Sequence, residues 1–335
     1  MPEPAQRASF SIGLNAVIVA VTRDAPRVLT VEGPRGEAAL PFGLLDPESE
    51  RTLELALRVR VREQTGLELG YVEQLYTFGD RDRDPRVRRE GVRPISIGYL
   101  ALVREAAPSD GAAWRDVYRF FPWEDWRAGR PPALEREIVP GLDRWVRAAP
   151  DPADRRRRRE RADIAFGLGG VGWDGERVLD RYELLYEAEL VSEPRRDRGR
   201  RAEADEADER RGAAGRRPEA GGAAGGVGEP MTLDHRRILA TALGRTRGKL
   251  KYRPVVFELV ADTFTLLQLQ RVVEALAGVR LHKGNFRRLV ERGGLVEGTG
   301  SRAPSGGRPA ELFRFRHEVL RERPAPGVGL PGAPR

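Results

Sequence analysis

The sequence predicts an α/β domain and a smaller C-terminal α+β domain, joined by a helical and then a polar segment. Three observations lead to this fold class. Over residues 8–126, short runs rich in β-branched and aromatic residues flank one charged amphipathic helix. Over 194–230, Arg, Glu, Ala and Gly replace nearly all large apolar side chains. From 231 onwards, helical segments lead into two strand-like runs around a glycine-rich basic loop, which is the order of a winged helix-turn-helix.

These boundaries predict five parts. They are an α/β domain at 8–126, a mainly helical insertion at 127–193, a disordered linker at 194–230, a winged helix-turn-helix DNA-binding domain at 231–320 and a disordered tail at 321–335. A chain of 335 residues is long enough for two domains that each bury a core.

Composition excludes some classes of protein. The chain has no cysteine, which rules out disulfides and thiolate metal sites. Its formal charge of +8 comes almost entirely from arginine and is only a weak indication of nucleic-acid binding. The apolar run Ala16–Val21 is too short to cross a bilayer. We therefore expect a soluble cytoplasmic protein with no membrane partner.

In the first domain, we expect a mixed sheet between helices. The strand candidates are Leu14–Thr22, Val28–Val31, Tyr71–Phe78, Ile95–Val103 and Val117–Phe121. A helix is predicted over Glu48–Thr65, with Asp46 and Pro47 at its start and Gly66 at its end. Leu55 and Val59 lie opposite the main apolar face, so we expect this helix to be covered on both sides.

The later elements follow from apolar spacing and caps. Helices are expected at 134–148, 177–190, 234–250, 254–260, 266–277 and 282–292, and strands at 295–297 and 311–315. Thr265 is the predicted N-cap of the helix at 266–277. The run Arg155–Arg159 is interpreted as a solvated helix face, with DNA contact as the alternative.

Two other patterns have weak functional interpretations. Gly167–Gly172 fits G-x-G-x-x-G, but no clear strand precedes it, so a turn is favoured over a dinucleotide site. The histidines at 235, 282 and 317 lack the spacing of metal ligands, and no metal site is predicted.

The stretch Gly43–Leu67, GLLDPESERTLELALRVRVREQTGL, resembles the Nudix box, G-x5-E-x7-R-E-U-x-E-E-x-G-U. Glu63, Gly66 and Leu67 match its end. Val59, Arg60 and Gln64 stand at the consensus Arg and at two metal-binding Glu positions. Because Mg²⁺ prefers oxygen ligands and Arg60 is a cation, the pattern favours loss of the metal site and of hydrolysis.

Longer segments resemble the Nudix-related transcriptional regulators of NAD metabolism, the NrtR type. The matching stretches are Tyr71–Arg86, Ile95–Ala101, Lys249–Phe257, Thr263–Val273, Asn285–Leu289 and Gly307–Arg316. The resemblance covers 8–126 and 231–318, and the middle insertion suggests a subgroup of the family. It implies a homodimer that represses NAD biosynthesis or salvage genes at a palindromic operator and senses ADP-ribose or a related nucleotide, with no required cofactor.

The candidate DNA contacts follow from charge and helix position. On the helix at 282–292, Phe286, Leu289 and Val290 form the inner face and polar residues the outer one. Arginine pairs with guanine and asparagine with adenine in the major groove. The expected DNA-binding residues are Lys249, Lys251, Thr265, Gln268, Lys283, Asn285, Arg287, Arg288, Arg302 and Arg308.

The expected nucleotide site surrounds the degenerate box. An aromatic side chain can stack on adenine, and arginines can bind a diphosphate. The candidates are Arg51, Arg58, Arg60, Glu63, Phe78, Asp80, Arg81 and Arg83. Two alternatives remain open: a Mg²⁺-dependent ADP-ribose pyrophosphatase with an accessory nucleic-acid domain, in which Glu63 is the remaining acid, and an interaction scaffold in which the wing contacts proteins.

Overall fold

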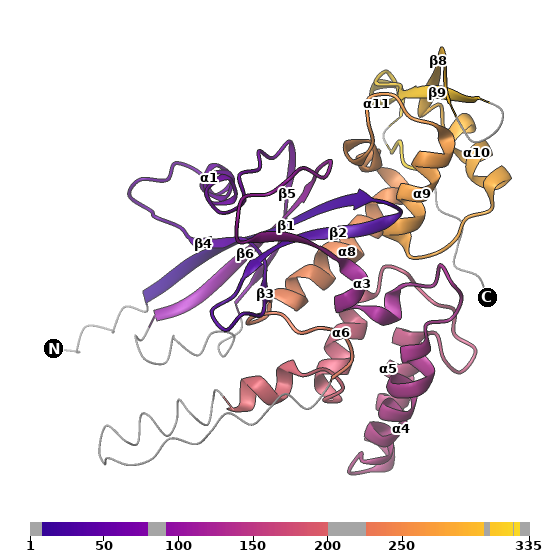
Figure 1. Cartoon of the computed structure of the whole chain (residues 1–335). Helices are drawn as coiled ribbons and strands as arrows, with labels where there is room; N and C mark the ends of the chain where they lie inside the picture. Colours follow the sequence, from indigo (N-terminus) through magenta and orange to yellow (C-terminus); the bar gives the residue numbers. More distant parts are fainter. Residues whose placement is uncertain (1–8, 80–91, 200–225, 305–308, 324, 329–335) are drawn as a thin grey trace.

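The structure is a computed structural model, and it describes residues 9–79, 92–199, 226–304, 309–323 and 325–328. Its first part is one mixed sheet (Figure 1). The strands are β1 (Ser9–Thr22), β2 (Ala25–Glu32), β3 (Ala38–Ala39), β4 (Phe42–Leu44), β5 (Tyr71–Phe78), β6 (Val92–Leu102) and β7 (Ala112–Asp116). Their order is β3-β2-β1-β6-β5, with β4 on β1 and β7 on β2. β1 and β6 pair in parallel over eleven residues.

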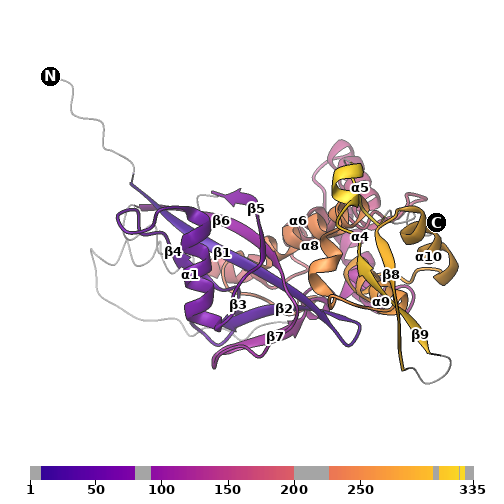
Figure 2. The ribbon, with the colours of Figure 1, turned by 90° about the horizontal axis from the view of Figure 1, so that it is seen from above.

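Side chains alternate between the two faces of this sheet, as the pleat requires. On β1, Ala16 and Ile18 face the core under helix α1 (Leu53–Thr65). Val17 and Val19 face the core that includes helix α8 (His235–Tyr252). Figures 1 and 2 show these two helices on opposite sides of the sheet. The predicted sandwich of a mixed sheet between helices is confirmed.

Helix α1 begins five residues later than predicted. The side chain of Thr52 accepts from the backbone NH of Leu55 and is the N-cap. Asp46 instead accepts from the backbone of Glu48 and the hydroxyl of Ser49, which closes a turn before the helix. Gly66 ends α1 in the left-handed conformation, as predicted.

The expectation that α1 is covered on both sides is wrong. Leu55 is 51% exposed and Val59 is 37% exposed, whereas Leu57 and Val61 are fully buried against the sheet. One apolar stripe of three to four residues per two turns is enough to attach a surface helix.

The predicted strand Val117–Phe121 is also wrong. The strand in this region is β7, which ends at Asp116, and Val117–Phe120 forms the short helix α3. The Asp116 carboxylate accepts from the backbone NH of Tyr118 at 2.8 Å and starts the turn. A 3-10 turn at Pro122–Glu124 follows. A short apolar run indicates that the segment is buried, but it fits a buried strand and a buried helix equally well.

The insertion is helical, as predicted. It contains a π-helical turn at Leu134–Ile138, α4 (Val139–Arg147), α5 (Pro152–Phe166) and α6 (Val178–Glu187). Gly167 caps α5 in the left-handed conformation, and Gly169 and Gly170 also have positive φ. A helix, not a strand, precedes this G-x-G-x-x-G segment, so it is the predicted turn and not a dinucleotide fingerprint.

Three arginines of the run Arg155–Arg159 form ion pairs within the insertion. Arg157 and Arg158 pair with Asp154, and Arg159 pairs with Asp143 on α4. The guanidinium of Arg158 also lies 4.8 Å from the ring of Trp145. These partners fit the solvated helix face that the sequence favours.

Helix α8 belongs to both halves of the molecule. On the sheet side, the methyl group of Ile238 packs over Gly98 of β6, where an added Cβ would lie 3.2 Å from it. The Nδ1 atom of His235 accepts from the backbone NH of Leu40 at 3.0 Å. On its other side, α8 packs against α6 and α9. Because α8 contacts both halves, the domain boundary at 231 stays a prediction.

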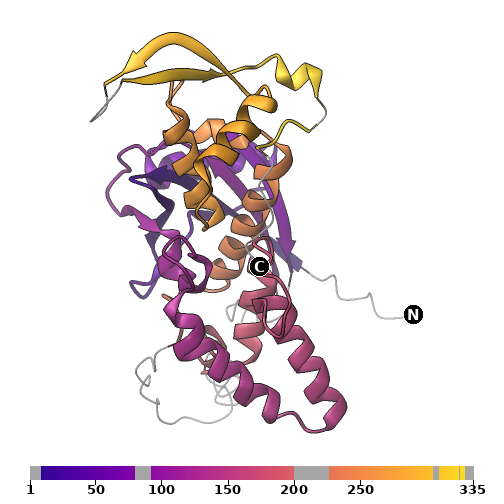
Figure 3. The same ribbon diagram turned by 90° about the vertical axis from the view of Figure 1, so that its right-hand side faces the viewer.

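The C-terminal part is a winged helix-turn-helix, as predicted. It contains a 3-10 helix at Val255–Leu259, α9 (Leu266–Ala277), α10 (Lys283–Arg292), β8 (Val296–Ala303), β9 (Ala310–Phe315) and α11 (Val319–Glu322). β8 and β9 pair antiparallel. Figure 3 shows this yellow hairpin at one end of the molecule and the magenta insertion helices at the other.

None of the helices in the described part of the chain combines the length and apolar character that a membrane crossing requires.

Candidate nucleic-acid interface and effector site

Helix α10 presents a polar outer face and an apolar inner face. Phe286 and Val290 are 2% and 0% exposed and attach the helix to the core, with Leu289 partly buried beside them. Lys283, Asn285, Arg287 and Arg288 are exposed, and so is Arg302 on β8; Arg308 lies outside the described residues. This arrangement places cationic and amide groups on the surface, where they can reach a partner such as the DNA major groove.

The polar side chains of α10 also contact one another. Arg287 Nε donates to Glu291 Oε1 at 2.7 Å, and Arg288 donates to Asn285 Oδ1. The hydrogen bond that Arg287 donates to Glu291 raises the pKa of Arg287 above its usual value. The pairs restrict the side-chain rotamers of both arginines.

Thr265 and Gln268 form a capping box at the start of α9. The Thr265 hydroxyl accepts from the backbone NH of Gln268, and the Gln268 side chain accepts from the backbone NH of Thr265 at 2.7 Å. The predicted N-cap is confirmed. The proposed DNA contact of these two residues stays a prediction.

Lys249 and Lys251, the predicted phosphate contacts of α8, both pair with carboxylates of other elements, and their contact with DNA stays a prediction. Lys249 bonds to Glu73 of β5 and donates to the hydroxyl of Tyr71 at 2.9 Å. Lys251 pairs with Glu176 of the insertion. Burial lowers the pKa of Lys249. Both lysines therefore connect α8 to other parts of the protein, because carboxylates on other elements occupy them.

On the opposite side of the sheet, α1 carries Arg60 and Gln64, which the sequence alignment predicts at metal-binding positions. Arg60 pairs with Glu50 at 3.0 Å and with Glu63 at 3.3 Å. Its side chain runs along Gly43, where an added Cβ would lie 2.8 Å from Arg60 Cδ. The guanidinium of Arg60 is thus held between two carboxylates.

Gln64 holds strand β4 against α1. Its Nε2 donates to the carbonyl of Phe42 at 2.6 Å, and its Oε1 accepts from the NH of the same residue at 3.1 Å. An amide can do both, whereas a carboxylate can only accept. Neither Arg60 nor Gln64 therefore fits a Mg²⁺ site, which requires oxygen ligands that are free to bind the ion.

We predict that Gln64→Glu lowers the free energy of unfolding by about 1–3 kcal/mol, because the carboxylate repels the Phe42 carbonyl and leaves it without a donor. Urea denaturation at neutral pH measures the change. Glu63→Gln is the matched control one residue away, because the Glu63 side chain is 57% exposed. An equal loss in both variants would contradict the role of the Gln64 amide.

Arg58, another predicted nucleotide contact, has partners elsewhere on and after α1. Arg58 pairs with Glu54 and donates to the carbonyls of Leu69 and Gly70, so it holds the loop after α1. Arg51 is exposed before the helix. Asp80, Arg81 and Arg83 lie outside the described residues.

Phe78 cannot stack on a nucleotide in this structure. It is 4% exposed and packs in the core between the sheet and α8. Its ring contacts Tyr76 edge-on at 5.4 Å, and Tyr76 is 62% exposed. The exposed aromatic side chain of β5 is therefore Tyr76, which sequence reasoning missed.

Sequence reasoning also missed the buried charges that join α8 to the insertion. Glu124 pairs with Arg181 of α6 and Arg247 of α8, and Arg236 pairs with Glu193 at 3.2 Å. All five side chains are at most 3% exposed. The signal available in the sequence was Gly244 and Gly248, which are unfavourable inside a helix unless another segment approaches closely. In the structure, Glu176 approaches both glycines. Its carbonyl oxygen would lie 2.7 Å from a Cβ added to Gly244, and its Oε2 would lie 2.9 Å from a Cβ added to Gly248.

The pKa values around Glu124 follow from burial and charge. Burial raises the pKa of Glu124, but Arg181 and Arg247 outweigh it and hold the pKa below the usual value. Burial lowers the pKa of Arg181, whereas Glu124 outweighs burial at Arg247 and raises its pKa. Both guanidiniums remain charged at neutral pH, because arginine does not deprotonate in proteins. Burial raises the pKa of neighbouring Tyr118 to about 12.

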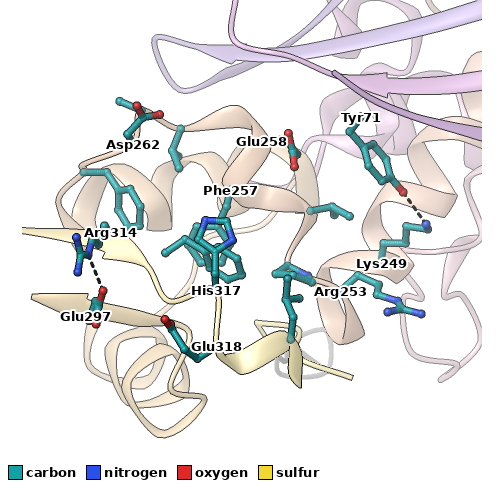
Figure 4. Close-up of a pocket in the computed structure, with 17 residues that line it drawn as sticks. Tyr71, Lys249, Arg253, Phe257, Glu258, Asp262, Glu297, Arg314, His317 and Glu318 are labelled. Atoms are coloured by element: carbon teal, nitrogen blue, oxygen red, sulfur yellow. Dashed lines mark hydrogen bonds and ion pairs between the residues drawn. The ribbon is translucent and has the colours of Figure 1, made fainter. Parts of the chain in front are cut away.

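A pocket of about 910 Å³ lies where α8 meets the winged helix (Figure 4). Phe257 and Phe315 stack in its wall with ring centroids 4.3 Å apart. Figure 4 shows Lys249 and Tyr71 bonded at one end and the Arg314–Glu297 pair at the other. Its charged groups have both signs and partly pair with one another, so its chemistry favours no single class of ligand.

Comparison with known proteins supports both halves of this fold. Residues 256–315 match the family described as the NrtR DNA-binding winged helix domain. The ADPR responsive transcriptional repressor NtrR of Acinetobacter baylyi is 36% identical over 85 residues, which are 25% of this chain and 34% of the repressor. The match thus spans about a third of the length of that curated relative.

Several solved structures resemble nearly the whole chain, and two of them illustrate the match. The crystal structure of Shewanella oneidensis NrtR complexed with a 27mer DNA has a TM-score of 0.53 and 19% identity, and the match covers 92% of this chain and 95% of that one. A MutT/nudix family protein from Enterococcus faecalis has a TM-score of 0.51 and 15% identity, with coverages of 94% and 89%. At these identities the likeness concerns the fold. Residues 256–315 are therefore similar to the NrtR DNA-binding winged helix domain, and the chain as a whole has a fold similar to that of Shewanella oneidensis NrtR.

Proposed function

We propose that this protein is a DNA-binding transcriptional repressor whose Nudix domain senses ADP-ribose or a related nucleotide without hydrolysing it. The observation that carries the proposal is the exposed cationic face of α10, on a winged helix attached through α8 to a Nudix sheet. The relative from Acinetobacter baylyi, which is named as an ADPR responsive repressor, supports the same pairing of sensor and DNA reader.

The proposal that hydrolysis is lost follows from Arg60. At 4 Å and an effective dielectric constant of 20, a fixed positive charge repels a second unit charge by about 4 kcal/mol. Glu50 and Glu63, the nearest acids, are already paired with this guanidinium. The same guanidinium can bind a diphosphate through charge-assisted hydrogen bonds. We infer that Arg60 helps to retain the nucleotide and disfavours the metal that would cleave it.

DNA recognition is proposed to use two copies of the chain. A homodimer places two α10 helices in successive major grooves, and its two-fold symmetry matches a palindromic operator of NAD biosynthesis or salvage genes. Nucleotide binding then shifts the dimer between two geometries with different DNA affinities, which linkage requires of any effector.

The repressor function is tested by selecting binding sites from a random DNA pool with the purified chain. We expect a palindromic sequence whose affinity falls steeply with salt, because phosphate contacts release counterions. A pool without sequence enrichment, or binding that does not depend on salt, would refute the function and favour the scaffold alternative.

The hydrolase alternative has one observation in its favour, because Glu50 and Glu63 lie close enough together to contact the same cation. Incubation of the chain with ADP-ribose and Mg²⁺ distinguishes the two functions. We expect no product above a protein-free control. Robust turnover that disappears in Glu63→Gln would show that the chain is a hydrolase and would refute the proposed sensor function.

A further inference from the structure

The carboxylate of Glu124 lies at the meeting point of four parts of the molecule. It is 1% exposed, and Glu124 ends the 3-10 turn Pro122–Glu124 near the end of the first domain. Arg181 of the insertion donates to both of its oxygens, at 2.5 and 2.9 Å. Arg247 of α8 donates to the same carboxylate and to the Glu124 carbonyl. A buried charge is stable only when such partners compensate its desolvation.

The same cluster holds the C-terminal end of α9. Arg247 Nε donates to the carbonyl of Leu276 at 3.0 Å, and the Tyr118 hydroxyl donates to that of Ala275 at 2.6 Å. The backbone NH of Trp126 donates to the carbonyl of Gly278 at 2.7 Å. The last carbonyls of a helix have no partners within the helix, so these donors fix both the position and the direction of α9.

Gly278 makes this contact possible. It ends α9 with φ +71°, and an added Cβ would lie 2.3 Å from the Glu124 carbonyl. A glycine is therefore required both by the backbone conformation and by the close approach of the two segments. The end of α9 lies directly on the Glu124 segment, with no side chain between them.

Helix α9 precedes α10 in the helix-turn-helix, so its orientation determines where α10 points. The buried charges thus connect the direction of α10 to the Nudix domain through Tyr118 and Glu124, and to the insertion through Arg181. For a dimer on a palindrome, that direction decides which half-site spacing both recognition helices can reach together.

We propose that Glu124 is the positioning residue that sets the orientation of the winged helix, and through it the operator spacing that the dimer accepts. The insertion takes part by supplying Arg181, which gives this segment a role in DNA recognition without contacting DNA. The proposal depends on the proposed function, namely that α10 reads a two-part operator.

The chain provides a matched control. Glu193 is 1% exposed and pairs with the buried Arg236 of α8, but this pair bonds to the carbonyls of Phe120 and Val227 instead of to α9. Glu124→Gln and Glu193→Gln both remove one buried negative charge next to α8. A merely structural role predicts the same consequences for both variants.

The test measures the affinity of the full chain for the selected operator and for the same operator with its spacer lengthened by about two base pairs. We expect the wild type and Glu193→Gln to discriminate between the spacings by at least about tenfold, and Glu124→Gln by less than about threefold. Unchanged discrimination in Glu124→Gln, or an equal loss in Glu193→Gln, would overturn the proposal. No operator binding by the wild type would instead refute the proposed function itself.

If Glu124→Gln does not fold, as judged by circular dichroism, Tyr118→Phe replaces it. This variant keeps the buried ring and removes only the hydroxyl that holds Ala275. Tyr182→Phe is its control, because Tyr182 is 1% exposed beside Arg236 and away from α9. We expect a smaller loss of spacing discrimination in Tyr118→Phe alone, and equal values in the two variants would overturn the proposal.

Discussion

Replacing Arg236 by methionine is expected to lower the free energy of unfolding by about 3–5 kcal/mol. Arg236 is fully buried, and its removal leaves the carboxylate of Glu193 without its cation in a site that is 1% exposed. It also leaves the carbonyls of Phe120 and Val227 without their donors. Equilibrium denaturation by urea measures the change.

Two variants separate the buried charge from other effects of this substitution. Arg237→Met changes the next residue of α8, whose partner Glu183 is 41% exposed, and we expect it to cost about 1 kcal/mol or less. The double variant Arg236→Met, Glu193→Leu is expected to recover part of the loss, because it removes the unpaired charge. Equal losses in Arg236→Met and Arg237→Met would contradict the interpretation.

Replacing Arg287 or Arg288 by alanine is expected to weaken operator binding by about 1–3 kcal/mol for each direct base contact, or roughly 5- to 150-fold. Both side chains are exposed on α10, while Phe286 and Val290 hold the helix in place, so the fold is preserved. Fluorescence anisotropy with labelled operator measures the loss. The preference for one base at the contacted position should also weaken.

Two further substitutions serve as references for these arginines. Arg302→Ala on the wing should weaken binding to all sequences alike and reduce the salt slope by about one. Lys251→Ala should reduce DNA affinity less than Arg287→Ala, because Lys251 lies on α8 and pairs with Glu176 of the insertion, whereas Arg287 lies on α10. A loss in Lys251→Ala as large as that in Arg287→Ala would restore the phosphate contact that the sequence predicts.

Local signals predicted the parts of the fold that depend on neighbouring residues. Thr265 and Gln268 form the expected cap because both partners lie within one helical turn. The alternating residues of β1 separate into two cores because successive side chains of a strand point in opposite directions. In α10, the helical spacing of the apolar residues identified the inner face in the same local way.

Interactions between distant residues could not be predicted in this way. The apolar stretch Val117–Phe121 fits a strand or a buried turn of helix. In the structure, the carboxylate of Asp116 caps this segment and it forms a helix. Lys249 has its partner Glu73 far away in the sequence, so its basic character alone indicated a phosphate contact. Phe78 was expected in the nucleotide site, but α8 covers it.

Buried arginines were the least predictable feature of the site. Arginine is usually a surface residue, so the sequence gives Arg181, Arg236 and Arg247 no distinction from the many others. Their burial depends on Glu124 and Glu193, which lie on other elements and had no motif to identify them.

The central claim is that the Nudix domain binds its nucleotide as a signal and not as a substrate. The most direct measurement is a titration of the protein–operator complex with ADP-ribose in the presence of EDTA, together with a parallel incubation in Mg²⁺ from which the nucleotide is recovered. We predict a change in operator affinity of roughly 5- to 150-fold without any divalent cation, and intact ADP-ribose at the end. An operator affinity that stays constant at saturating ADP-ribose would contradict the claim.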